Sequence, residues 1–183
     1  MRMAPAMVLA LALGCALLVG GRSGRTARAE DVCAVPEGYA LLDGEEQAAV
    51  RAINDLRAQA GLVPLTVSVV LMRPARWKSQ FMAATGTFTH DDPFRSWLQR
   101  LSDCGYSDRS AVAENLAAGT ATGQAAVQMW WESSPHRANL LNPDARFIGI
   151  ARAAGVGPYR WYWTANFGAA AGDTARAEDA GGQ

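Results

Sequence analysis

Two histidines and one isolated glutamate are the residues of this 183-residue chain whose types could do chemistry. His90 and His136 each lie in a polar stretch beside the end of a predicted helix, and an imidazole can ligate a metal ion or transfer a proton near neutral pH. Glu114 stands alone in the apolar stretch AVAENLA, where a half-buried carboxylate needs a partner such as an imidazole. Together the three have the ligand types of an open zinc site.

The spacing of these residues leaves a structural role open. They are 24 and 22 residues apart, which matches no short zinc pattern such as H-E-x-x-H. A lone histidine is more often structural or solvated, and for Glu114 the more common role is to bond backbone amides in a loop. If Ser134 caps a helix, His136 lies in its first turn, where the helix dipole lowers the pKa and favours the neutral ring. A serine hydrolase is disfavoured because no G-x-S-x-G elbow is present.

Hydrophobic periodicity predicts five helices that position these residues. Asp43 is the N-cap of the first, which ends before Gly61, and Gly86 ends the second, in which Pro74 either starts or bends the helix. The third begins at Pro93 and ends at Gly105, the fourth covers 122–132, and the fifth runs from the N-cap Ser134 to Leu141. The expected inward residues of the third and fourth helices are Phe94, Trp97, Leu98, Leu101, Ala125, Ala126, Met129 and Trp130.

Two antiparallel strands are predicted near the C-terminus, over 147–153 and 159–167, with a hairpin loop at 155–158. In the second strand Trp161, Trp163, Ala165 and Phe167 share one face, and Tyr162, Thr164 and Asn166 share the other. Helices first and strands last indicate an α+β domain whose small antiparallel sheet packs against helices.

Residues 1–29 have the pattern of a secretory signal peptide: Arg2, an apolar run over 6–19, and a small-x-small cleavage pattern ending at Ala29. The run is too short for a permanent membrane span. Its removal leaves 13 basic and 17 acidic residues and one lysine, Lys78, which argues against a nucleic-acid partner. We expect an N-terminal segment over 30–41, one domain over 42–168, and a disordered tail over 169–183.

Two cysteines, Cys33 and Cys104, remain after removal of the leader. In an oxidising compartment an isolated pair most simply forms one disulfide, which would tie the new N-terminus to the turn at residues 103–105. The alternative is two free thiols.

Five motifs in order along the chain carry a resemblance to a known family. They are INDLRAQAGL at 53–62, FTH at 88–90, AENL at 113–116, WWESSPHRANLL at 130–141 and YWTANFG at 162–168. Together they resemble the bacterial branch of the CAP superfamily, the cysteine-rich secretory, antigen 5 and pathogenesis-related proteins, also called SCP-like. The resemblance covers about residues 42–168.

The resemblance implies a secreted three-layer α-β-α sandwich with a shallow cleft lined by two histidines and two acids, which in some members holds zinc or another divalent cation. By motif the histidines are His90 and His136 and the first acid is Glu114. The second acid position falls on Ser133 if Trp130 is the motif tryptophan. Glu132 lies one residue early, and a register starting at Met129 restores it as a fourth metal ligand.

The resemblance supplies no reaction, so three functions stay open. We expect a secreted or periplasmic binding module, not an enzyme, whose cleft holds a divalent cation such as zinc and a small-molecule, lipid or peptide ligand. The first alternative is a metal-assisted, peptidase-like hydrolase with Glu114 as general base. The second is a non-catalytic protein that interacts with a partner in the cell envelope.

Overall fold

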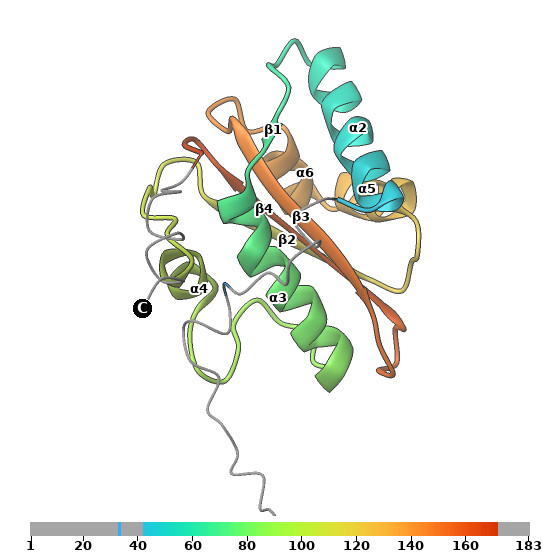
Figure 1. Ribbon diagram of the computed structural model, residues 1–183. Helices are drawn as coiled ribbons and strands as arrows, with labels where there is room; N and C mark the ends of the chain where they lie inside the picture. The colour runs from blue at the N-terminus through green and yellow to red at the C-terminus, as the bar shows by residue number, and fades with distance from the viewer. Residues whose placement is uncertain (1–32, 34–41, 172–183) are drawn as a thin grey trace, which may run out of the picture.

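The computed structural model describes Cys33 and residues 42–171, and the expected leader, the segment 34–41 and most of the tail lie outside these residues. The described part contains five helices and one four-stranded sheet (Figure 1). The predicted α+β sandwich is therefore confirmed. No helix in the described ranges is both long enough and apolar enough to cross a membrane.

Helices α2 (Gly44–Gln59) and α3 (Val69–Thr85) form where the periodicity predicts them. Asp43 and Glu46 make a reciprocal capping box at the start of α2. In α3 the hydroxyl of Ser68 accepts from the Leu71 amide, so the helix starts five residues before Pro74, which lies inside it. Gly86 ends α3 in the left-handed conformation, with φ of 72°, as a glycine C-cap predicts.

Helix α4 (Trp97–Asp103) is shorter than predicted and does not begin at Pro93. The carboxylate of Asp92 accepts from the amides of Phe94 and Arg95, which closes a turn there, and Ser96 then caps the helix. Phe94 and Leu98 are exposed as a result, so the predicted apolar face was wrong at both positions.

Helices α5 (Gly123–Glu132) and α6 (Ser134–Leu140) follow in direct succession. Trp130 and Ala126 are buried as predicted, whereas Met129 is 43% exposed and was wrongly placed in the core. The N-cap of α6 is Ser133, not the expected Ser134, and its side chain makes no capping hydrogen bond.

The sheet contains two strands that the sequence pattern missed. Its order is β1 (Thr66–Val67), β3 (Phe147–Ala154), β4 (Trp161–Gly168) and β2 (Ala113–Ala118). The predicted hairpin is β3–β4, while β1 pairs parallel to β3, so the sheet is mixed. β2 is hard to recognise because it is buried along most of its length and lacks β-branched residues.

Helix layers cover both faces of the sheet (Figure 1). Helix α3 lies across β3 and β4, and Ser79 of α3 donates to Thr164 of β4. On the other face Trp163, Ala165 and Phe167 join a core with residues of α2, α5 and α6. The predicted alternation of β4 is therefore confirmed, with one side chain set for each layer.

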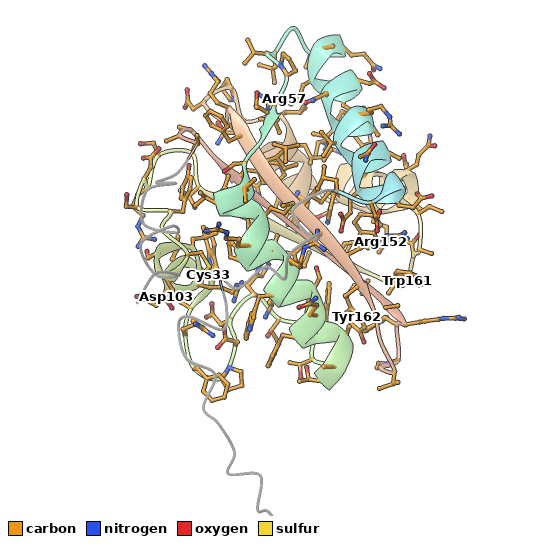
Figure 2. The ribbon with its side chains drawn as sticks, viewed as in Figure 1. Cys33, Arg57, Asp103, Arg152, Trp161 and Tyr162 are labelled. Carbon is orange, nitrogen blue, oxygen red and sulfur yellow. A yellow bond between two sulfur atoms is a disulfide. The ribbon has the colours of Figure 1, made fainter. Side chains whose placement is uncertain are left out.

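The hydrogen bonds of one buried arginine and one disulfide connect segments that are far apart in the sequence. Arg57, buried at the end of α2, donates hydrogen bonds to the carbonyl oxygens of Val63, Leu140, Asn142 and Ala145 (Figure 2). Cys33 and Cys104 form the predicted disulfide, with Cα atoms 5.1 Å apart, beside α4.

Candidate functional site

Strand β2 places Glu114 in the sheet with its side chain only 1% exposed. Its Oε1 atom lies 3.0 Å from Nδ1 of His90, which precedes α4 in a loop. The imidazole partner that the sequence predicts for this carboxylate is therefore present. The side chain of His90 is 46% exposed, so a buried acid holds an imidazole that solvent can reach.

Arg100 of α4 completes this cluster, and it is not among the residues predicted from the sequence. Its Nη2 atom donates to Oε2 of Glu114 at 2.7 Å and to the carbonyl oxygen of His90 at 3.1 Å, and Nη1 lies 3.3 Å from Asp92. A buried carboxylate is tolerated where a cation with good geometry neutralises it. The missed signal is that Arg100 follows Trp97 by three residues, a spacing that puts it on the side of α4 that packs against the domain.

Lys78 of α3 forms a hydrogen bond with the loop that contains His90. It is fully buried, and Nζ donates to the carbonyl oxygen of Asp91 at 3.0 Å. Burial first, and then the charge of Arg100, lower the pKa of Lys78 to about 8, against the opposing effect of Glu114. The sequence contained a signal here as well, because Lys78 shares a helical face with the buried Ala75 and Met82.

His136 lies near the start of α6 and is half-buried. Burial first, and then the charge of His90, lower the pKa of His136. The direction agrees with the prediction, but the cause is desolvation and the neighbouring imidazole rather than the helix dipole. The shift favours the neutral ring of His136, the form that can ligate a metal ion or accept a proton.

Asn115 fixes the backbone at His136. Its Nδ2 atom donates to the His136 carbonyl oxygen at 3.0 Å, while Asn139 of α6 donates to its Oδ1 atom at 2.8 Å. Adjacent residues of a strand point to opposite faces, so β2 holds His90 through Glu114 on one face and His136 through Asn115 on the other. No pattern in the sequence indicates this role of Asn115.

Glu132, the alternative fourth ligand, is exposed at the end of α5, where Oε1 accepts from Nε2 of Gln128 at 2.8 Å. No hydrogen bond joins it to His90, Glu114 or His136 within the part of the chain that the structure describes. In that same part, no group of three or more His, Cys, Asp and Glu side chains is placed to hold a metal ion.

The contacts of Glu114 and of the two histidines decide which of these side chains could bind a cation. Both oxygens of Glu114 already accept from His90 and Arg100, and the adjacent guanidinium opposes a second cation there. The two imidazoles remain as the candidate nitrogen donors. A carboxylate bonded to the second nitrogen of a ligating histidine is a common arrangement around metals, because it sets the tautomer and the ring orientation.

A separate groove lies between α2 and α5, and its lining does not include His90, Glu114 or His136. Its lining mixes apolar and polar side chains: Ala52, Asp55, Leu56, Gln124, Val127, Gln128 and Trp131.

An α-β-α sandwich whose edge strand holds a histidine–glutamate pair and a second histidine defines the class of this protein. The sequence model of the Cysteine-rich secretory protein family (CAP) matches residues 50–167, and the chain belongs to that family.

Relatives in bacteria share this domain. The chain is 36% identical over 106 residues to the protein YkwD of Bacillus subtilis (strain 168), which covers 57% of this chain and 41% of YkwD. It thus spans less than half the length of that relative.

Two solved structures show the same fold. An extracellular protein containing an SCP domain from Bacillus anthracis str. Ames is 30% identical, with a TM-score of 0.57, covering 66% of this chain and 39% of that one. An outer surface protein from Borrelia burgdorferi is 23% identical, with a TM-score of 0.61, covering 69% of this chain and 92% of that one.

Proposed function

We propose that this protein is an exported binding module that takes a ligand at His90 and His136. The observation that carries the proposal is the half-exposed imidazole of His90, anchored to a carboxylate that is itself buried against Arg100. Burying two charges costs free energy that hydrophobic residues of similar volume would not. An arrangement that lowers the stability of the fold while it orients one accessible polar group is typical of a functional site.

Three observations support export. The Cys33–Cys104 disulfide is stable in oxidising compartments outside the cytosol. The relatives named above include an extracellular protein and an outer surface protein. The leader pattern at residues 1–29 points the same way.

A divalent cation such as zinc is the ligand component that the two imidazoles fit. His90 would bind through Nε2, the nitrogen that Glu114 leaves available, and His136 through its neutral ring. Glu114 would then orient the His90 ring instead of binding the metal itself. This differs from the metal-ligand role predicted for Glu114 from its residue type. Water or a bound molecule would supply the remaining coordination positions.

Titration calorimetry with zinc tests this proposal on the oxidised full chain. We expect binding, weakened about tenfold or more by His136→Ala because one of two protein donors is lost. Glu132→Gln is the matched control: unchanged affinity assigns the site to the imidazoles, whereas an equal loss would restore Glu132 as a ligand. Absence of zinc binding to the wild type would contradict the cation component.

The hydrolase alternative gains less support from the geometry. A general base must be within reach of the water it activates, and the side chain of Glu114 is only 1% exposed, with one hydrogen bond already accepted by each oxygen. The contacts therefore favour binding over hydrolysis through this carboxylate.

A further inference from the structure

Strand β2 is at the end of the sheet and pairs with β4 on one side only. The Gly119 amide donates to the Trp161 carbonyl oxygen at 2.9 Å, in register with the ladder. Because bonded pairs alternate in an antiparallel ladder, the odd-numbered residues of β2 turn their backbone groups toward β4. Glu114, Leu116 and Ala118 therefore turn their N–H and C=O groups away from the sheet.

The opposite edge of β4 gives the same assignment independently. The Gly155 amide donates to the Arg160 carbonyl oxygen at 2.8 Å, which sets the even-numbered residues of β4 toward β3. Its odd-numbered residues are thus left for β2, and these pair with the odd-numbered residues of β2.

The outward groups lack partners within residues 42–171 and Cys33. No backbone or side-chain hydrogen bond there reaches the outward N–H or C=O of Glu114 or Leu116. Glu114 is 5% exposed and Leu116 is 4% exposed, so little water reaches these outward groups. Buried backbone groups without a partner are costly, and a strand that pairs with them removes the cost.

This edge passes between the two candidate histidines. The Glu114 side chain holds His90 on one face of β2, and the Asn115 side chain holds the backbone of His136 on the other. Gly119, which follows the strand, is exposed.

We propose that an extended peptide binds along the outer edge of β2 as an added strand, paired with the backbones of Glu114 and Leu116 and flanked by His90 and His136. The inference rests on the proposed function and names the ligand class. Successive outward residues of a strand are about 7 Å apart, and only an extended main chain repeats donors and acceptors at that spacing.

Amide hydrogen exchange tests the free edge before any ligand is added. On the oxidised full chain we expect the amides of Glu114 and Leu116 to exchange at least about a hundredfold faster than those of Asn115 and Ala117, which bond to β4. Equal protection at all four positions would mean that the edge is already covered, and it would overturn the inference.

A library of randomised hexapeptides with acetylated and amidated ends then tests the occupant. In the best binder we expect N-methylation of alternate amides to weaken binding about tenfold, and methylation of the intervening amides to change it little. Glu114 and Leu116 should become protected in the complex.

Failure of this inference differs from failure of the proposed function. A library without a binder, or losses without alternation, overturns the peptide while zinc binding through His90 and His136 stands. Loss of zinc binding with the alternating pattern intact would overturn the cation and leave the peptide edge.

Discussion

Glu114 meets an imidazole with one oxygen and a guanidinium with the other, and all three groups depend on one another. Arg100 is fully buried, so its charge is compensated mainly by Glu114 and Asp92. Removing Arg100 or Glu114 leaves a buried charge without its main partner, which costs far more than losing an exposed pair.

We therefore expect Arg100→Met to lower the free energy of unfolding by about 3–5 kcal/mol. Arg109→Met is the matched control, because Arg109 is exposed and its loss should change stability by about 0.5 kcal/mol or less. Urea unfolding of both variants measures the difference. Equal losses would show that the buried pair does not stabilise the domain.

Lys78 predicts a pH dependence of stability. Its pKa of about 8 in the folded protein lies below the ordinary value of 10.5, so between these pH values the unfolded chain binds more protons. The contribution of Lys78 to stability should thus rise from pH 8 to 10.5, by at most about 3 kcal/mol. Lys78→Met should lack this rise relative to wild type in urea unfolding at several pH values, and parallel curves would contradict it.

At the scale of elements, the packing of α3 on β3 brings two backbones into contact. A Cβ atom built on Gly149 of β3 would lie 2.0 Å from the backbone carbon of Leu71 and 2.2 Å from the Met72 nitrogen. No side-chain rearrangement can relieve contacts with a helix backbone. The layer that carries Lys78 thus depends on a glycine in the strand.

We expect Gly149→Ala to destabilise the protein by about 3 kcal/mol or more through overpacking. Gly44→Ala at the start of α2 is the control, since its Cβ would meet nothing within 4 Å and alanine favours helix. Thermal unfolding of the two variants checks this, and a Gly149→Ala protein as stable as the control would show that the layers can separate without cost.

At the scale of the whole molecule, the disulfide joins positions 71 residues apart in sequence. In the chain-entropy model, closing such a loop stabilises the folded state by about 4 kcal/mol. We expect Cys33→Ala/Cys104→Ala to lose up to that amount in urea unfolding. A reductant should destabilise the wild type and leave the double variant unchanged, whereas a wild type insensitive to reductant would contradict the prediction.

Local sequence patterns determined much of this protein. Caps such as Asp43 and Gly86 and the alternation of β4 follow from short-range spacing and residue type, which do not depend on the rest of the fold. The pairing of the two cysteines follows from their number once the leader is removed. The site residues His90, Glu114 and His136 were found from residue type and from the family motifs.

The tertiary structure alone decided which groups those residues contact. β2 exists because residues 113–118 pair with residues 162–167, a contact that no local pattern encodes. The same pairing sets which backbone groups point outward, and it brings Arg100 of α4 against Glu114. Hydrogen bonding and charge compensation act through space, so the partners of a buried carboxylate are known only once distant segments pack together.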